Sequence, residues 1–312
     1  MGINMQKIVT IGGGTGHFQI LKGLKNYECR ITAVVNMSDD GGSSGALRDE
    51  YGILPPGDAR QCMVALADED ESKLLRDMFS FRFKDGHNLG NLMITALAGI
   101  SGSSAQAIKD ASKLLNIKGN VLPVTTDDVI LHGESADGKI LKGQTEVSYP
   151  KDKNAIIKRI FNVPEAFLYK EAGEAIRDAD KIVICPGELY GSILSNLIVG
   201  GMREALQESK AKKIYVCNLF TKEGSYSFKA KDFVQEIEKY AGIKLDKIII
   251  SVGKPSFDAL KKYIGENSKL IEDDLGNDER IVRGNYMAEY PSAEKTLLRH
   301  VPEKIARAIM AV

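Results

Sequence analysis

Three aspartates in the N-terminal part of the chain have side chains suited to chemistry. Asp39 and Asp40 are adjacent, and Asp58 follows in the segment ILPPGDARQ. Carboxylates in such a group can hold Mg²⁺ or take a proton from an acceptor hydroxyl. Neighbouring residues on an extended segment point to opposite sides, so only one of Asp39 and Asp40 is expected to face a reacting group, and the sequence does not decide which. Asp58 has a second interpretation, as the N-cap of the helix that ARQCMVALAD predicts.

A glycine turn precedes these aspartates. The stretch KIVTIGGGTG (7–16) is a short β-branched run that ends in glycines and leads into HFQILKGLKNY, which predicts strand, tight turn and helix. Backbone N–H groups at such a turn point outward together and can bind a phosphate; the alternative is an ordinary strand–helix turn. The dinucleotide fingerprint is incomplete, because His17 stands where its last glycine is expected. The predicted phosphate contacts are Gly13, Gly14, Thr15 and Gly16.

The second predicted strand, RITAVVNM, leads into SDDGGSSGALRDEYG. Asn36 lies about twenty residues beyond the glycine turn, where a doubly wound sheet reaches the ribose of a nucleotide. The carboxylate expected there is absent, which argues against an NAD-specific dehydrogenase. The small residues that follow are expected to form a loop that a ligand can approach closely, although a solvated acidic turn is the competing interpretation. They are Ser38, Gly41, Gly42, Ser43 and Ser44.

Three further segments place small or polar groups at an element's end. His87, Asn88 and Asn91 begin an apolar helix, where they either face an anion or serve only the structure. A buried strand from 182 to 185 ends at Pro186 and Gly187, before a helix with Ser192 as its expected cap. The next strand ends at Asn218, with Lys222 in the loop after it. Because parallel strands end at one edge of a sheet, these groups predict one shared ligand crevice.

Seven motifs follow one another along the chain: GGGTG, NMSDDGGSSGALR, PPGDARQ, GHNLGNL, LPVT, PGELYGSILSNL and NLFT. In these motifs, their order and their spacing, the chain resembles the bacterial gluconeogenesis factor family, which is related to the 2-phospho-L-lactate transferases of deazaflavin cofactor biosynthesis. The resemblance covers essentially the whole chain. It implies a variant Rossmann-like fold that binds UDP-sugars or NAD-like dinucleotides, and a role in growth and cell shape on gluconeogenic carbon sources.

The resemblance also implies a division of the crevice into two walls beside the phosphate loop 13–16. One wall would be 36–44 with Asp58, His87, Asn88 and Asn91; the other would be Pro186, Gly187, Asn218 and Lys222. Arg299 corresponds to a region near the ligand in the family, and Arg suits a bidentate phosphate contact. Glu188 stands where the family often has Ser. Because a carboxylate repels a phosphate, Glu188 is expected to point away or to meet a sugar hydroxyl.

Composition and patterning bound the remaining expectations. The 312 residues are 43% hydrophobic with a formal net charge of zero, which argues against wholesale binding to nucleic acid or membranes. The chain reads as one α/β domain over 1–312, a mostly parallel sheet with helices on both faces, with a β-rich insertion at about 121–163 and a hairpin turn at Asp137-Gly138. Four dispersed cysteines without metal spacing and the absence of a signal peptide predict reduced thiols in the cytoplasm.

Two functions from different classes follow. The first is a regulator that binds a UDP-sugar or an NAD-like dinucleotide and passes that state to protein partners in envelope or carbon metabolism. The second is a transferase of the phospholactate type, in which Asp39, Asp40 or Asp58 would hold Mg²⁺ or act as the base. A homo-oligomer is left open, and no dedicated metal site is predicted. The incomplete fingerprint disfavours a third function, an NAD-dependent oxidoreductase.

Overall fold

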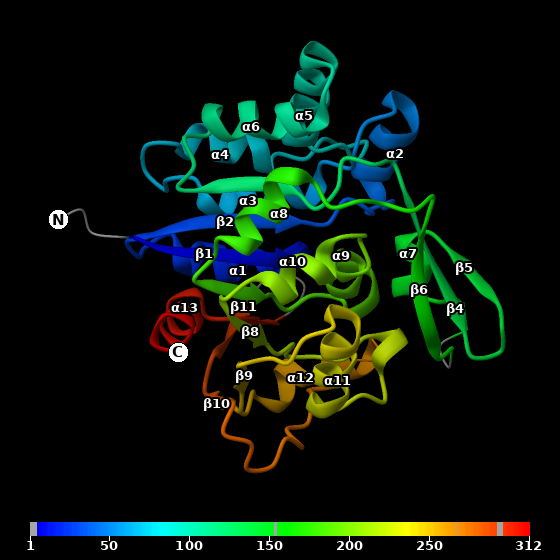
Figure 1. Ribbon diagram of the computed structural model, residues 1–312, viewed down its shortest axis with the longest axis vertical. Coiled ribbons are helices and arrows are strands. Elements are labelled where there is room, and N and C mark those ends of the chain that lie inside the picture. The colour runs from blue at the N-terminus through cyan, green and yellow to red at the C-terminus, as the bar shows by residue number, and fades with distance from the viewer. Residues whose placement is uncertain (1–4, 153–154, 267, 292–295) are drawn as a thin grey trace.

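A seven-stranded sheet runs through the computed structural model, which describes residues 5–152, 155–266, 268–291 and 296–312 (Figure 1). The strand order is β10-β9-β8-β7-β1-β2-β3, and every pairing in this sheet is parallel. Helices flank it, so the expected α/β class is confirmed. The strands are β1 (Gln6–Gly12), β2 (Cys29–Val35), β3 (Asn120–Pro123), β7 (Lys181–Ile184), β8 (Lys212–Val216), β9 (Lys247–Ser251) and β10 (Ile281–Gly284).

The central strands are covered on both faces, as continuous apolar runs in a parallel sheet predict. All four residues of β7 are buried, and Ile8 and Ile11 of β1 are almost without exposed surface. α1 packs against α3 and α13, and α10 packs against α8 and α11. The first helices are α1 (Gly14–Leu24), α2 (Gly42–Tyr51), α3 (Gly57–Leu66), α4 (Lys73–Ser80), α5 (Leu89–Ser101) and α6 (Ser104–Leu114). The later ones are α8 (Lys170–Arg177), α9 (Ser195–Leu197), α10 (Met202–Glu208), α11 (Ala230–Ala241), α12 (Phe257–Gly265) and α13 (Pro302–Ala311).

The β-rich insertion lies to one side of the main sheet (Figure 1). Its three antiparallel strands are β4 (Ile130–Ser135), β5 (Ile140–Lys142) and β6 (Ile157–Val163). The predicted turn at Asp137-Gly138 connects β4 to β5, with Gly138 at φ +84°. Two parts of 121–163 differ from the expectation. The segment around 121 belongs to β3 of the main sheet, and QTEVS forms the short helix α7 (Gln144–Ser148) instead of extending a strand.

Two local expectations are wrong. The small residues after Asp40 do not stay a loop, because α2 begins at Gly42. Ser192 is not a helix cap; it lies inside the π-helical segment η1 (Leu189–Leu194). Near the C-terminal helix, β12 (Thr296–His300) pairs with β11 (Met287–Pro291) in a separate antiparallel sheet.

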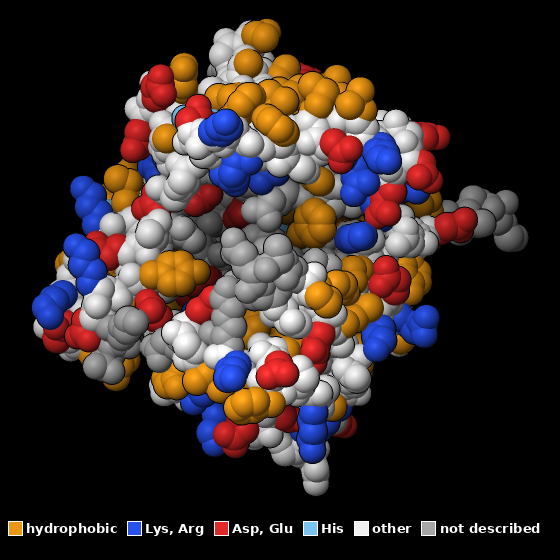
Figure 2. Space-filling model, turned by 180° about the vertical axis from the view of Figure 1, so that it is seen from behind, with side chains coloured by type: hydrophobic (Ala, Val, Ile, Leu, Met, Phe, Trp, Pro, Cys, Tyr) orange, Lys and Arg blue, Asp and Glu red, His pale blue; other side chains and the backbone are white. Residues whose placement is uncertain are grey.

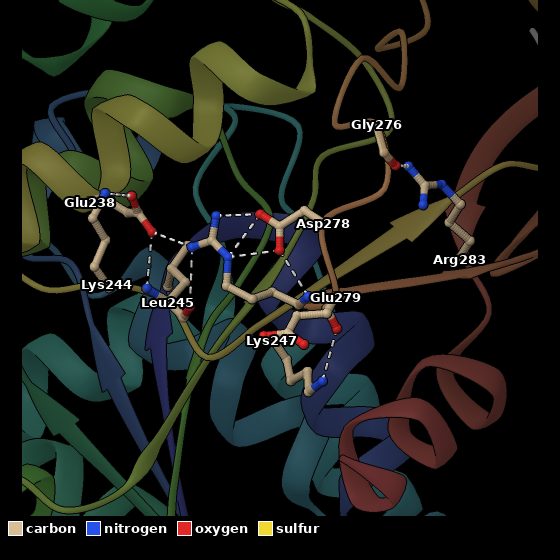
Figure 3. A network of polar contacts seen from close by, with 9 residues as sticks. Glu238, Lys244, Leu245, Lys247, Gly276, Asp278, Glu279 and Arg283 are labelled. Carbon is tan, nitrogen blue, oxygen red and sulfur yellow. Dashed lines mark hydrogen bonds and ion pairs between the residues drawn. The ribbon is translucent and has the colours of Figure 1, made fainter.

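Charged side chains fix the edge of the sheet at β10 (Figure 3). Glu238 of α11 accepts hydrogen bonds from Arg280, at 2.7 Å, and from Lys244, at 2.6 Å. Arg280 also pairs with Asp278 at 2.6 Å. The network therefore connects α11 to the segment that leads into β10. The connection between β8 and α11 contains the 3₁₀ turn η2 (Glu223–Ser225).

One edge of the surface is apolar (Figure 2), and the cysteines form no disulfide. Hydrophobic side chains gather along the upper edge of the face in Figure 2, the edge at which α5 projects in Figure 1. Ile100 of α5 is 82% exposed. Over the described ranges, no helix is both long and apolar enough to cross a bilayer. All four cysteines are free, as predicted.

Candidate functional site

A cavity of about 330 Å³ lies where the carboxyl ends of β1, β7 and β8 meet. It brings together much of what the sequence predicted for the phosphate loop and the far wall. Nine predicted residues line it: Gly13, Gly14, Thr15, Gly16, Pro186, Gly187, Asn218, Lys222 and Arg299. Nine others line it without having been predicted as contacts: Gln19, Tyr149, Glu188, Ser192, Leu219, Phe220, Tyr263, Leu298 and His300.

The glycine turn forms the wall of the cavity nearest to β1, and its conformation requires glycine. Gly14 has φ +66°, a left-handed conformation that L-residues rarely adopt, and a Cβ there would meet open space. Gly16 lies so close to the carbonyl oxygen of Pro186 that no Cβ fits between them. The turn is thus locked against the β7 end, while Gly14 and the exposed Thr15 remain open to a ligand.

His17 supports this turn from behind. It is fully buried, and its Nε2 lies 2.7 Å from the hydroxyl of Thr10 on β1. Its Nδ1 lies 3.6 Å from the thiol of Cys62 on α3. Burial lowers the pKa of His17 to about 4, so the ring is neutral at physiological pH. The residue that breaks the dinucleotide fingerprint therefore joins β1, α1 and α3 beneath the turn.

The far wall is held by Asn218 and Glu188. The Asn218 side chain donates to the carbonyl oxygen of Gly187 and lies within 3.4 Å of the Gly187 N–H. Glu188 caps η1 by accepting from the N–H groups of Tyr190 and Gly191, and from the hydroxyl of Ser148 at 2.7 Å. Burial raises the pKa of Glu188, and these hydrogen bonds oppose the rise. The protein's own groups therefore satisfy the Glu188 carboxylate, which lies beside the glycine turn.

Lys222 and Arg299 are the two described cations that line the cavity, and the charge of Lys222 opposes the rise that burial causes in the pKa of the Glu188 carboxyl. Lys222 follows β8 and Arg299 lies on β12, and both are half-buried. No ion pair is formed by either side chain within the part of the chain that the structure describes. The contact of Arg299 is a long 3.5 Å hydrogen bond to the carbonyl oxygen of Leu298. The cavity therefore holds positive charge that a bound anion could neutralise.

The remaining predicted residues form a separate polar network behind the glycine turn and do not line the cavity. Ser43 is at its centre, with its hydroxyl 3.3 Å from Nδ1 of His87 and 3.2 Å from the amide nitrogen of Asn91. Asn88 caps α5 by accepting from the N–H of Asn91. Arg60 donates to Asn91 at 2.9 Å. We use the name polar network for all the predicted residues outside the cavity, together with Arg60; their hydrogen bonds form several small groups. The set comprises Asn36, Ser38, Asp39, Asp40, Gly41, Gly42, Ser43, Ser44, Asp58, Arg60, His87, Asn88 and Asn91.

Two members of the polar network connect it to neighbouring segments. Asp40 accepts from both the N–H and the hydroxyl of Thr145, at 2.9 and 2.6 Å, and so anchors α7 of the insertion. Asn36 donates to the carbonyl oxygen of Gly191 in η1 at 3.0 Å. Both side chains are thus engaged with protein groups, which differs from the ribose or metal contacts expected of them.

Asp58 joins the polar network to the glycine turn. It lies in the first turn of α3, whose N-cap is Pro56, so the prediction of Asp58 as the cap is wrong. Its carboxylate instead accepts the N–H of Gly14 at 2.9 Å. Burial, followed by the negative charge of Asp39, raises the pKa of Asp58 to about 7. Burial also raises the pKa of Asp39, so this pair disfavours two full charges.

The chemistry of these carboxylates bears on metal binding. Over the described ranges, no group of three His, Cys, Asp or Glu side chains could hold a metal ion. Mg²⁺ is commonly bound by one or two carboxylates together with substrate phosphates. Asp39 and Asp58 fit that limited role, because their shared negative charge would be relieved by a cation. The structure thus supplies part of a ligand set and no complete metal site.

The apolar residues of the cavity are those that sequence reasoning missed. Phe220 and Tyr263 stack with ring centroids 4.0 Å apart. Together with Leu298 they belong to a small apolar cluster apart from the main core. These residues come from distant parts of the chain, so no local pattern marks them. Leu298 is next to the predicted Arg299, and Phe220, inside the motif NLFT, lies two residues from both Asn218 and Lys222.

The sequence is similar to that of a described family and to several named proteins. The family model described as 2-phospho-L-lactate transferase CofD matches residues 8–287. A putative gluconeogenesis factor of Thermotoga maritima is 41% identical over 97% of this chain and 98% of its own length. The gluconeogenesis factor of Halalkalibacterium halodurans is 39% identical over 98% and 96%, and that of Bacillus subtilis is 35% identical over 97% of both chains.

A solved structure has the same fold as this chain. The crystal structure of a protein member of the UPF0052 family from Bacillus halodurans superposes with a TM-score of 0.92 at 37% sequence identity. The match covers 99% of this chain and 100% of the other. The arrangement of sheet and insertion is therefore that of a known fold.

Proposed function

The chain belongs to the 2-phospho-L-lactate transferase CofD family, among relatives named gluconeogenesis factors, and we propose that it is a regulator that binds a nucleotide diphosphate. The ligand class is a UDP-sugar or an NAD-like dinucleotide. In this proposal the bound state supports growth and cell morphogenesis on gluconeogenic carbon sources. The protein acts in the cytoplasm, on partners in envelope or carbon metabolism.

One observation carries the proposal: the glycine turn lies in the same cavity as two cations that form no ion pair with a described residue. Gly14 presents the turn, and Lys222 and Arg299 supply the charge. A diphosphate accepts hydrogen bonds from such a turn and neutralises such cations. The apolar side of the cavity, with Phe220 and Tyr263, offers a surface for the base of the same ligand.

The second candidate function, a transferase, is favoured by the Asp58 carboxyl. A pKa of about 7 suits a general base near neutral pH, and Asp58 contacts the glycine turn directly. Asp39 beside it would hold Mg²⁺ together with the phosphates of a nucleotide diphosphate donor, where the cation would stabilise charge on the transferred group. Asp40 is the weakest of the three for this role, because Thr145 occupies its carboxylate.

A ligand panel separates the two functions. The chain is mixed with UDP-sugars, NAD(H), GDP or AMP, with and without Mg²⁺, and its thermal unfolding is recorded. The mass of each ligand after incubation is then measured by mass spectrometry. A ligand at one hundred times its Kd adds about 2.7 kcal/mol to the free energy of unfolding. A strong shift with an unchanged ligand supports the regulator, and an altered mass supports the transferase. Stabilisation by none of these ligands would contradict both.

A regulator must also change its association with another protein when its ligand binds. Homo-oligomerisation and protein partners are proposals of the same kind. Sedimentation of the chain with and without the ligand from the panel measures the first. Affinity capture in the two ligand states measures the second, and a partner that binds equally in both states would argue against regulation by that ligand.

A further inference from the structure

Tyr149 lines the cavity from the side of the β-rich insertion, and it has no role so far. It directly follows α7 and is 50% exposed. Two other phenyl or phenol rings line the cavity among the described residues, those of Phe220 and Tyr263, and these residues are only 9% and 6% exposed. Their rings stack on each other, so each already uses one face. Tyr149 is therefore the described aromatic residue of the cavity with the most surface left for a ligand.

The main chain that carries Tyr149 is fixed by contacts on both sides of α7. Thr145 donates its N–H and its hydroxyl to Asp40, at 2.9 and 2.6 Å. Ser148, the last residue of α7, donates to Glu188 at 2.7 Å. The N–H of Tyr149 donates to the carbonyl oxygen of Thr145 at 2.9 Å. Because this backbone is set before a ligand arrives and a tyrosine side chain has few rotatable bonds, ordering it on binding costs little entropy.

The charges around the Tyr149 phenol indicate which way its side chain extends. Burial, and after it the negative charges of Glu188, Glu223 and Glu266, raises the pKa of the phenol. These carboxylates lie at the start of η1, on η2 and after α12, all outside the insertion, and α7 packs against both η1 and η2. The ring therefore extends from the insertion toward the wall that holds Glu188 and Lys222. The raised pKa keeps the phenol neutral at physiological pH, so it adds no negative charge beside a diphosphate.

We propose that the base of the bound nucleotide stacks on the ring of Tyr149, which makes Tyr149 the residue that distinguishes a nucleotide from a diphosphate without a base. The inference rests on the proposed binding of a nucleotide diphosphate. The glycine turn and Lys222 offer donors and charge to the phosphates, and the base attached to them meets the open ring in the same cavity. Every base has a π-face, so stacking on an aromatic ring favours all of them. Uracil and adenine nucleotides should therefore use the same contact.

The first test uses the absence of tryptophan from the chain. Tyr149→Trp introduces a single indole, whose fluorescence is quenched when a base stacks on it. UDP and ADP, the nucleoside diphosphates of a UDP-sugar and of an NAD-like dinucleotide, should quench this emission. Inorganic pyrophosphate carries the charge without a base and should leave it unchanged. Tyr51→Trp is the matched control, because Tyr51 is 57% exposed at the end of α2 and does not line the cavity, so UDP should not quench its emission.

The second test separates stacking from a structural role by calorimetric titration. Tyr149→Phe keeps the ring and should bind UDP as tightly as wild type. Tyr149→Leu removes the aromatic face and should weaken UDP binding about tenfold, as expected for the loss of one stacked base, while pyrophosphate affinity stays the same. If Tyr149 served only to hold α7 in place, Tyr149→Leu would weaken the binding of both ligands equally, and that result would overturn the inference.

Two other results would also overturn it. One is unquenched emission from Tyr149→Trp at a UDP concentration that calorimetry shows to be saturating, and the other is wild-type UDP affinity in Tyr149→Leu. The two variants test the contact separately, so misfolding of one leaves the other as a test. If the wild-type chain binds neither UDP nor ADP, the proposed function fails and this inference with it. Nucleotide binding without quenching removes the stacking contact alone.

Discussion

Two polar regions meet at the glycine turn, and they differ in how their hydrogen-bonding groups are used. In the polar network, Ser43, Asn88 and Asn91 bond to one another, and Asp40 bonds to Thr145. In the cavity, Lys222 and Arg299 form no ion pair with a described residue. Both regions are rich in polar residues, yet only one leaves its groups open to a ligand.

The difference separates framework from recognition. Buried polar groups that satisfy one another fix the position of the elements that carry them. Groups that remain unpaired at a cavity cost free energy in the empty state, and a ligand that pairs them recovers it. The polar network therefore positions α2, α3 and α5 around the turn, and the cavity is the region that we propose to contact the ligand. Each prediction below alters one region and leaves the other intact.

The largest effect is expected from Gly14→Val. Valine projects into the open space of the cavity and disfavours the left-handed conformation at φ +66°. Ligand binding should weaken by more than about 3 kcal/mol, beyond detection in a titration. Gly102→Val is the matched control, because Gly102 has the same φ of +66° and open space around it but lies at the end of α5. Both should lose similar stability, and normal binding by a folded Gly14→Val would refute the phosphate assignment.

The next effect concerns Asp58, which stands between the two regions. Its folded-state pKa of about 7 exceeds the unfolded value of 3.8, so the folded chain binds more protons between these pH values. Its contribution to the free energy of unfolding therefore falls as pH rises from 4 to 7. Asp58→Asn does not lose this contribution. Between pH 4 and 7 its free energy of unfolding should therefore rise by about 2–4 kcal/mol relative to that of wild type, measured by urea unfolding at each pH.

Two features make this pH difference specific. The pKa values of His17 and His300, lowered to about 4 by burial, contribute the opposite slope, but both chains carry them and the difference cancels them. Asp68→Asn is the control, because backbone hydrogen bonds lower its pKa and its titration lies below the window. A flat difference between Asp58→Asn and wild type would mean that Asp58 is charged and compensated in the folded chain.

A moderate effect is expected from the cations of the cavity. Lys222→Ala or Arg299→Ala removes a charge-assisted hydrogen bond worth roughly 1.5–3 kcal/mol, which weakens UDP-sugar binding about tenfold to a hundredfold. Uridine, which has no diphosphate, should lose less. Lys84→Ala removes an exposed cation outside the cavity and should change neither affinity. Equal losses for UDP-sugar and uridine would remove the diphosphate from this position.

The smallest effect is expected from Asp40→Asn. Asparagine keeps an oxygen that accepts from Thr145, so α7 should stay anchored and ligand affinity should change by less than about 0.7 kcal/mol. Asp39→Asn, assayed beside it with and without Mg²⁺, reports on the transferase. If ligand binding needs no Mg²⁺ and survives both substitutions, Asp39 and Asp40 belong to the polar network and do not contact the ligand. A tenfold loss of affinity in Asp40→Asn would move Asp40 into the recognition region.

The sequence predicted the part of the site that the topology of a parallel sheet determines. Glycine and proline marked the ends of β1 and β7, and parallel strands bring such ends to one edge. Gly14, Gly187 and Asn218 therefore could be placed together without coordinates. The sequence did not reveal that Asp58 bonds to Gly14, because a residue in the first turn of a helix matches the pattern of a cap equally well.

The residues that sequence reasoning missed depend on contacts between distant segments. Glu188 was treated as a departure that would repel a phosphate, and its role became visible only when Ser148 and the start of η1 were seen to hold its carboxylate. His300 and Tyr263 join the cavity through the packing of α12 and the β11–β12 pair, which no periodicity encodes. Tertiary burial, and not local pattern, decides these positions.

The span of sequence joined at the cavity has a consequence for synthesis. Gly14 belongs to the first helix, whereas Arg299 and His300 belong to the last strand, and α13 after that strand packs against α1. On a ribosome the glycine turn emerges early and waits for almost all of the described chain before its opposite wall arrives. Closing contacts of such large sequence separation is slow. A nascent chain should therefore be unable to retain ligand until β12 and α13 have emerged, so ligand capture would report the completion of folding.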